Sequence, residues 1–230
     1  MAVVGSGVMA ERLSSGNLAI ALLANSLATG AALVALILSF AAISGAHFNP
    51  AVTLFSAAQK ALAWRDVPVY VVCQIVGAFA GVLAAHLMFG LPAFSISHHI
   101  RSGFSQVFSE SIATAGLLLV IFLCGRVQAT LIPFAVAAYV TGAYWFTSST
   151  CFANPAVTFA RAASDTFAGI RPADVPGFLA GQVLGTGAAV ALYRFLLTPR
   201  ENSVQEVAHA GEDHGQAETV GGGDNVIVAD

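Results

Sequence analysis

The stretch "SGAHFNPAVTLFSA" (Ser44–Ala57) is one half of an internal repeat, because "SSTCFANPAVTFAR" (Ser148–Arg161) repeats its centre. Both contain Asn-Pro-Ala-Val-Thr, and one copy lies in each half of the 230-residue chain. Proline suits the first turn of a helix, where its φ is already helical and its missing N–H has no partner anyway. Asparagine before it is a favoured N-cap. Each triplet therefore predicts a helix start, at Asn49-Pro50-Ala51 and at Asn154-Pro155-Ala156.

The composition indicates a membrane protein. Hydrophobic residues make up 57% of the chain and charged residues only 9%, against about 25% charged residues in a typical soluble domain. Five apolar stretches are long enough to cross a bilayer, which takes about 20 residues. The sequence therefore predicts an all-α membrane protein. The five stretches are Leu18–Ile43, Val67–Leu91, Phe104–Gly125, Ala129–Thr147 and Val175–Leu197.

Charge and cysteine content argue against several function classes. The formal net charge is −3, with seven acids and one base from Pro199 onward, so nothing indicates nucleic-acid binding. We expect the acidic segment 199–230 to be disordered and aqueous, and its two histidines to be solvated rather than metal-bound. Cys73, Cys124 and Cys151 have neither paired nor metal-type spacing. We expect no cofactor and no metal, and small buried side chains for Cys73 and Cys124.

Each triplet is followed by a helical segment that is too short to span, about Ala51–Lys60 and about Ala156–Ser164. Ten helical residues rise only ~15 Å, half of a hydrocarbon core of ~30 Å. Two such half-helices that meet end to end at the midplane would fill this thickness. Three crossings lie between the triplets, and an odd number turns the second half upside down relative to the first. Inverted repeats with broken helices are an architecture of transport proteins.

The two repeats, 1–91 and 104–198, differ at their start. Two complete spans precede the second triplet, whereas one complete span and ten residues, too few to span alone, precede the first. The intramembrane acid Glu110 has no counterpart in the first repeat, because it lies 44 residues before Asn154 and the position 44 residues before Asn49 is Gly5. We therefore expect the first membrane helix to be truncated by about 20 residues.

The triplets also predict what the molecule does. Two facing half-helix N-termini place roughly half a positive charge each at the midplane. The amides of Asn49 and Asn154 can then point N–H donors into the gap. A water molecule or a hydroxylated solute would be held through its oxygen, whereas a cation would meet a positive field. The pattern predicts a pore for neutral solutes.

From about residue 10 to residue 197 the sequence closely resembles the aquaporin, or major intrinsic protein, family. The resemblance implies six spans, two re-entrant half-helices, cytoplasmic termini in a bacterial inner membrane and a homotetramer with one pore per subunit. It also implies that the intramembrane acid holds loop backbone, that the histidine braces its own loop, and that the glutamines tie helices together. Besides the triplets, the matching residues are His47, Gln74, Glu110 and Gln182.

The resemblance further implies a constriction at the outer mouth, formed by four positions, the last of which is usually an arginine directly after the second triplet. Counted from the asparagines without gaps, these positions hold Thr29, Gly142, Cys151 and Val157. Such small, uncharged residues predict a wider, less polar aperture with no fixed charge. Arg161 lies one turn beyond Val157 and about 40° round the helix. It either restores positive charge in the outer vestibule or caps the C-terminus of the half-helix.

Valine at the arginine position resembles a bacterial subgroup linked to arsenic resistance. This implies arsenious acid and methylated arsenicals, besides glycerol and water, as solutes, and Cys151 is either a thiol for trivalent arsenic or merely a small residue. Two alternatives to a channel stay open: an inverted-repeat secondary transporter, which usually needs intramembrane charges, and a non-conducting truncated fragment. No nucleophile–base pair or metal cluster converges in the membrane segments, so we expect no enzyme.

Overall fold

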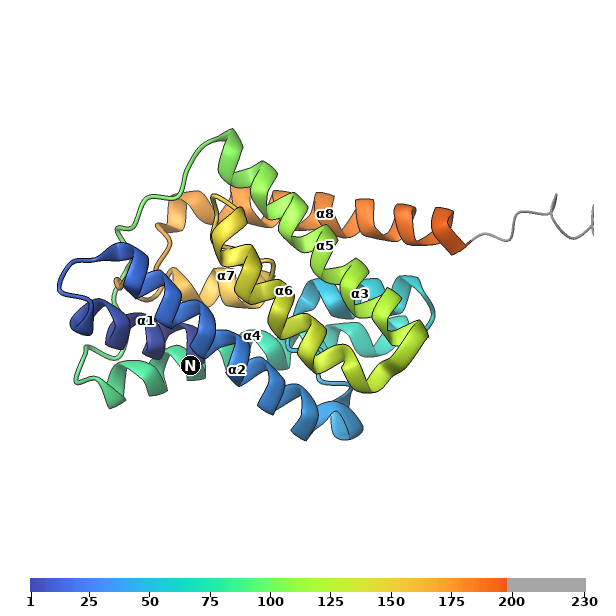
Figure 1. Ribbon diagram of the computed structural model, residues 1–230, viewed down its shortest axis with the longest axis horizontal. Helices are drawn as coiled ribbons and strands as arrows, with labels where there is room; N and C mark the ends of the chain where they lie inside the picture. The colour runs from blue at the N-terminus through green and yellow to red at the C-terminus, as the bar shows by residue number, and fades with distance from the viewer. Residues whose placement is uncertain (198–230) are drawn as a thin grey trace, which may run out of the picture. The chain divides into compact units, whose positions relative to one another are not determined.

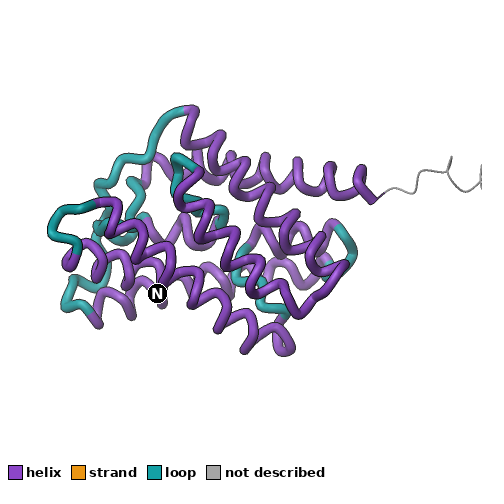
Figure 2. Tube along the Cα trace, viewed as in Figure 1, coloured by secondary structure: helices purple, strands orange, loops and turns teal. Residues whose placement is uncertain are grey.

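The computed structural model describes residues 1–197, and the predicted tail, 199–230, lies outside the described residues. Residues 1–197 contain helices and loops and no strand (Figures 1 and 2). One compact unit extends from Met1 to Tyr193, and the last turn of the final helix belongs to the next unit. The elements are α1 (Ala2–Leu13), α2 (Leu18–Ser44), α3 (Pro50–Ala58), η1 (Trp64–Asp66), α4 (Val67–Met88), α5 (Phe104–Gln128), η2 (Ala129–Leu131), α6 (Ile132–Phe146), α7 (Pro155–Arg161), η3 (Pro172–Asp174) and α8 (Val175–Leu197).

The five predicted apolar stretches are all helical, with ends that differ from the prediction by a few residues at most. Four helical stretches among residues 1–197 are long and apolar enough to cross a membrane: Leu18–Ser44, Trp64–Met88, Phe104–Phe146 and Pro172–Leu197. The third stretch is divided by the turn η2 into α5 and α6, which pack against each other. This architecture confirms the predicted all-α, aquaporin-like membrane fold.

The two half-helices lie among the long helices. The half-helix α3 packs against α4 and α5, α7 packs against α4, and α3 and α7 touch each other. The long helices α2 and α6, which hold matching places in the two repeats, lie side by side (Figure 1). With 9 and 7 residues, α3 and α7 rise only ~13 and ~10 Å. The repeat therefore places the starts of two short helices close together inside the bundle.

The first residues of the chain form the helix α1, which packs against α2 and α4. Its backbone is held by Asn25 of α2, a side chain that is only 2% exposed. The Nδ2 atom of Asn25 donates to the carbonyl of Val3 at 2.8 Å and to Oγ of Ser6 at 2.9 Å. With 12 residues, α1 rises ~18 Å. This segment is therefore a packed part of the helix bundle.

The interpretation of Cys73 as a buried side chain is wrong. In the single chain Cys73 is exposed and Cys124 is partly buried. The same helix α4 also turns Val69, Val72 and Val76 outward, with exposed fractions of 64%, 59% and 64%. Lipid tails are as apolar as a protein core. An apolar sequence context therefore does not predict burial in this chain as it does in a soluble one.

Two glycines of α8 let its backbone approach that of α5 closely. A Cβ at Gly181 would lie 2.5 Å from the carbonyl oxygen of Val107, and one at Gly185 would lie 2.3 Å from that of Ser111. Small residues allow such close approach in membrane helix pairs, where dispersion contacts drive association. Since α5 carries Glu110 and α8 carries Gln182, this contact also brings two predicted site residues together.

We predict that Gly185→Ala lowers the stability of the folded chain by about 1–3 kcal/mol, because the added methyl forces α5 and α8 apart. Gly187→Ala is the matched control, since a Cβ there meets no atom within 4 Å. The measurement is the fraction of monodisperse protein that remains in detergent after heating to a series of temperatures. Equal midpoints for the two variants would contradict the close helix contact.

Candidate functional site

The two loops that lead into the triplets share one backbone conformation. Phe48 and Ala153, which directly precede the asparagines, have φ values of 49° and 45°. Ala46 and Cys151, two residues earlier in each loop, have φ values of 48° and 50°. Such left-handed conformations cost a non-glycine residue about 1 kcal/mol or more and persist only where the surroundings fix them. The match extends the repeat from the sequence to the backbone.

Each asparagine of the triplets caps its own half-helix. The Oδ1 atom of Asn49 accepts a hydrogen bond from the backbone N–H of Ala51 at 2.9 Å. The Oδ1 atom of Asn154 accepts from the N–H groups of Ala156 and Val157, at 3.1 and 3.2 Å. A proline occupies the first turn of both helices, as the triplets predict. Both half-helices therefore begin at the asparagines.

The same two side chains also reach across to the opposite loop. The Nδ2 atom of Asn49 donates to the carbonyl of Ala153 at 2.7 Å, and that of Asn154 donates to the carbonyl of Phe48 at 2.9 Å. The acceptors are thus the left-handed residues that precede the asparagines. A carboxamide has two N–H donors, and the second one on each asparagine has no protein acceptor among residues 1–197. One donor per repeat therefore remains available.

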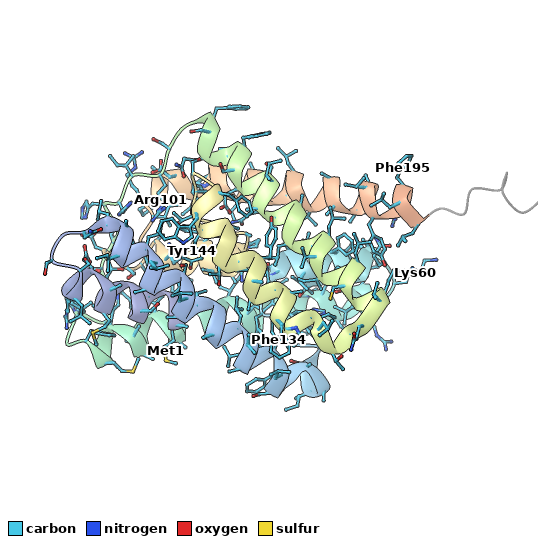
Figure 3. The ribbon with its side chains drawn as sticks, viewed as in Figure 1. Met1, Lys60, Arg101, Phe134, Tyr144 and Phe195 are labelled. Carbon is cyan, nitrogen blue, oxygen red and sulfur yellow. The ribbon has the colours of Figure 1, made fainter. Side chains whose placement is uncertain are left out.

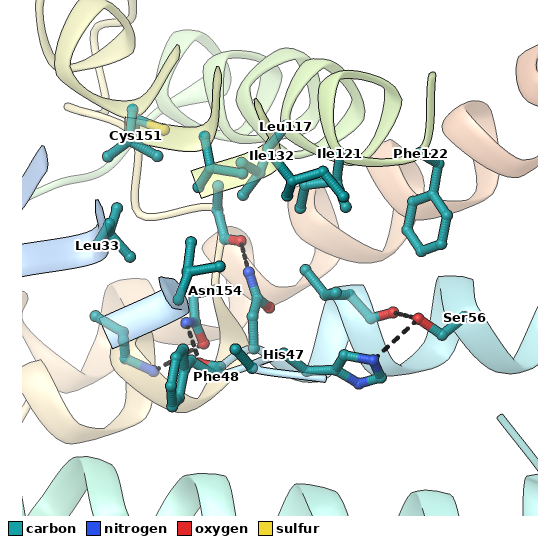
Figure 4. A pocket seen from close by; sticks show the side chains of 18 of the residues that line it. Leu33, His47, Phe48, Ser56, Leu117, Ile121, Phe122, Ile132, Cys151 and Asn154 are labelled. Atoms are coloured by element: carbon teal, nitrogen blue, oxygen red, sulfur yellow. Dashed lines mark hydrogen bonds between the residues drawn. The ribbon is translucent and has the colours of Figure 1, made fainter. Parts of the chain in front are cut away.

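Both asparagines line a cavity of about 480 Å³. Figure 4 shows Cys151 near one end of it and Ser56 and Phe122 near the other, with Asn154 between them. We refer to these as the Cys151 end and the Ser56 end. Residues of the two left-handed loops, among them Phe48 and Cys151, line one side of the cavity. The other side is aliphatic and is formed by Leu33, Ile37, Leu117, Ile121, Ile132, Val136 and Val140.

Glu110 of α5 is fully buried and holds the second loop. Its carboxylate accepts from the backbone N–H of Phe152 at 2.9 Å, from that of Ala153 at 2.8 Å and from Nε2 of Gln182 at 2.7 Å. The Nε2 atom of Gln182 also donates to Oγ1 of Thr158 at 2.8 Å. In this structure Glu110 and Gln182 bind the loop and the half-helix, and neither lines the cavity.

The first loop is held by a different set of side chains. Nδ1 of His47 lies 3.1 Å from Oγ1 of Thr53, and Nε2 of His47 lies 3.4 Å from Oγ of Ser56. The Nε2 atom of Gln74 donates to Oγ1 of Thr53 at 2.9 Å. Thr53 holds the place in α3 that Thr158 holds in α7, so the two glutamines bind equivalent threonines.

Comparison with known proteins fits this geometry. The profile of the family described as Major intrinsic protein matches residues 1–127. The aquaglyceroporin AqpS of Rhizobium meliloti (strain 1021) is 47% identical over 207 residues, which are 90% of this chain and 88% of that protein. The chain belongs to the major intrinsic protein family. Members of this family are channels, so the chain is a multi-pass membrane channel and not an enzyme.

Other members of the major intrinsic protein family match over shorter regions. The glycerol uptake facilitator protein of Bacillus subtilis (strain 168) is 36% identical over 100 residues, 38% of this chain and 36% of that protein. The probable aquaporin NIP7-1 of Arabidopsis thaliana is 31% identical over 122 residues, 53% of this chain and 42% of that protein. The similarity therefore includes both bacterial and plant members of the family.

Three of the four residues predicted to form the constriction line the cavity, and the fourth does not. Thr29, Cys151 and Val157 line it. Gly142 is exposed and borders neither this cavity nor the second described one. Tyr144, only 3% exposed, lines the cavity from the same helix. At the Cys151 end the structure thus has the large aromatic ring of Tyr144, where the sequence predicts Gly142.

Two hydroxyl groups meet at the Cys151 end. Oη of Tyr144 lies 3.3 Å from Oγ1 of Thr29, so α6 and α2 are joined by a buried hydrogen bond at this level. Val157 and Arg161 of α7 also line the cavity. Thr29, Val157 and Arg161 also border a second cavity of about 640 Å³, which α1 and α4 line as well. Of the four predicted constriction residues, Thr29 and Val157 therefore stand where the two cavities adjoin.

Arg101 lines neither cavity but binds the loops beside the second half-helix, a role that the sequence does not predict. Its Nε donates to the carbonyl of Gly169 at 2.8 Å, and its Nη1 to Oγ1 of Thr150 at 3.3 Å. Burial lowers the pKa of Arg101 to about 10, so the guanidinium stays charged at neutral pH. Figure 3 shows Arg101 near Tyr144, with Lys60 at the far end of the bundle. In the sequence, Arg101 is marked only as a single arginine in the loop before α5.

The loop that carries Arg101 lies along the segment that follows α7. The N–H of Ser97 donates to the carbonyl of Ala162 at 3.0 Å. The carboxylate of Asp165 accepts from the N–H of His98 at 2.9 Å and lies 3.1 Å from its Nδ1. These two hydrogen bonds lower the pKa of Asp165 below its usual value. These hydrogen bonds between the two loops hold the segment that follows α7 in place.

We predict that Glu110→Gln destabilises the second loop and lowers solute flux. The new amide group would point a donor at a backbone N–H, and a buried unsatisfied group costs about 1–3 kcal/mol. Glu11→Gln is the control, because Glu11 is an exposed acid on α1. Thermal stability in detergent and glycerol flux in proteoliposomes would be measured for both variants. Wild-type values for Glu110→Gln in both assays would contradict the assigned role.

Proposed function

We propose that this chain is a passive channel for small neutral solutes, namely water, glycerol-like polyols, arsenious acid and methylated arsenicals. The observation that supports the proposal most strongly is the pair Asn49 and Asn154. Each keeps one N–H donor without a protein acceptor among residues 1–197, and both donors belong to residues that line the cavity. A solute oxygen is the partner that such donors need.

The two sides of the cavity fit a solute with hydroxyl groups on one side and carbon on the other. Loop backbone and asparagine amides replace the hydrogen bonds that the hydroxyl groups lose on leaving water, which removes most of the desolvation cost. The aliphatic wall accepts the carbon side without such a cost. Relatives described as an aquaglyceroporin and a glycerol uptake facilitator support glycerol and water as solutes.

The same arrangement opposes cations. The half-helices α3 and α7 begin at the two asparagines, and the positive ends of their dipoles face the cavity. A cation that entered would lose its water shell and meet donors rather than acceptors. Positive half-helix ends are a known means of excluding protons and cations from such pores. The channel therefore selects for neutral molecules.

Arsenicals are proposed on chemical grounds. Arsenious acid is neutral at neutral pH and carries three hydroxyl groups, so it offers the same acceptors as glycerol. Val157 leaves the position after the second triplet without a charge, and the thiol of Cys151 lines the same end of the cavity. A thiol there gives trivalent arsenic a soft ligand without closing the aperture with a bulky side chain.

We also propose that the protein acts as a homotetramer in a bacterial inner membrane, with both termini on the cytoplasmic side. A bacterial relative that matches 90% of this chain supports the proposed location in a bacterial membrane. Large apolar side chains cover the outside of the single chain, as a surface against lipid or other subunits requires. The solute path would then run through each subunit rather than between subunits.

We predict that Val157→Arg lowers glycerol flux by at least about tenfold, which corresponds to about 1.4 kcal/mol on the barrier. The arginine would narrow the cavity beside Thr29 and add a charge. The assay is stopped-flow light scattering on proteoliposomes, with arsenious acid tested after glycerol.

Val157→Leu is the control for that experiment, because it adds bulk without charge. Flux through the unmodified chain that does not exceed that of empty liposomes would contradict the channel proposal. Flux that is equal in the unmodified chain and Val157→Arg would instead contradict the position of the constriction. A flux that saturates and accumulates solute against its gradient would indicate a transporter.

A further inference from the structure

Arg161 is a buried cation at the end of the second half-helix. It is the last residue of α7, only 3% exposed, and it lines both cavities. No carboxylate of residues 1–197 forms an ion pair with it. A buried charge that no carboxylate contacts directly is costly. Such a cost indicates that the charge has a use at this position.

The side chain of Arg161 is held in place by two contacts. The centre of its guanidinium lies 3.4 Å from the ring centroid of Phe152, as in a close cation–π contact. Its Nε donates to the carbonyl of Ala168 in the loop after α7. That acceptor is not one of the last carbonyls of α7, so this hydrogen bond does not cap the half-helix. The two contacts fix the plane of the guanidinium.

Phe152 is itself anchored from several sides. Its backbone N–H donates to Glu110, its ring packs edge to face against Phe178 at 4.9 Å, and Arg101 lies over the same ring at 5.1 Å. Arg161 thus rests on an aromatic ring that is itself held from several sides. Its position cannot relax without moving that loop.

The outer part of the guanidinium remains available. An arginine has five N–H donors, and only Nε has an acceptor in the described part of the chain. The four N–H groups of the two Nη atoms have none there, and Arg161 lines the same cavity as Val157 and the hydroxyl pair of Thr29 and Tyr144. Free donors and a full positive charge therefore border the Cys151 end.

We propose that Arg161 is the specificity-determining cation of this channel: it repels cations at the Cys151 end and donates hydrogen bonds to the oxygens of passing neutral solutes. This proposal rests on the channel function proposed above. The positive charge of Arg161 acts on solutes from a position one helical turn beyond Val157. Phe152 is the positioning residue, because it holds the guanidinium without neutralising it.

The test compares Arg161→Met with the unmodified chain in proteoliposomes, with sodium entry followed by a trapped sodium-sensitive dye and glycerol flux by light scattering. We expect sodium entry to rise at least about tenfold in Arg161→Met, because the repulsion at short range in a low-dielectric site is lost. Glycerol flux should persist. Arg65→Met is the matched control, since Arg65 is exposed and lines neither cavity.

Two further variants keep the test decisive if Arg161→Met does not fold. Arg161→Lys keeps the charge, so it should exclude sodium as the unmodified chain does. Phe152→Leu keeps the arginine but removes its support, so it should leak sodium. Wild-type sodium exclusion in Arg161→Met, or in Phe152→Leu where Arg161→Met does not fold, with glycerol flux intact, would overturn this proposal and leave the channel function standing. Absence of glycerol flux in the unmodified chain would instead overturn the channel function.

Discussion

The reciprocal hydrogen bonds between the two asparagines and the opposite loops are the contacts on which the structure depends. Inside a bilayer no water satisfies a broken helix, so non-helical backbone is tolerated only where protein or a cavity surrounds it. Asn49 binds the carbonyl of Ala153 and Asn154 binds that of Phe48, and each asparagine also caps its own half-helix. Each half-helix start thus donates a hydrogen bond to a backbone carbonyl of the opposite loop.

The two repeats meet this constraint with different side chains. The second loop has a full carboxylate, Glu110, which accepts two backbone N–H groups. The first loop has only neutral partners, in which His47 and Gln74 both bind Thr53. Hydrogen bonds to a charged group contribute about twice as much as neutral ones. The second loop, which also carries Cys151 and Phe152, is therefore held by the stronger hydrogen bonds, and it lines one end of the cavity.

The sequence was sufficient to predict the helices, the two half-helices and their caps, because proline, asparagine and apolar length act locally. It did not predict the left-handed residues before the asparagines, since Phe48 and Ala153 have no local preference for that conformation. It also predicted Gly142 as a constriction residue, whereas Gly142 is exposed and Tyr144 lines the cavity from the same helix. Two positions along a helix differ by about 200°, so a small error in register moves a residue from the cavity to the outside.

The same helical geometry explains why an arginine four positions late still reaches the cavity. Arg161 is rotated by only about 40° from Val157, and it lies about 6 Å further along the axis of α7. Both residues consequently line the same two cavities. In the proposed channel, Thr29 and Tyr144 would select solutes by size, and Arg161 would select them by charge at a different level of the same path. The charge that is missing beside the second triplet would then be supplied from one helical turn further along α7, and the proposed path would still present a positive field to passing solutes.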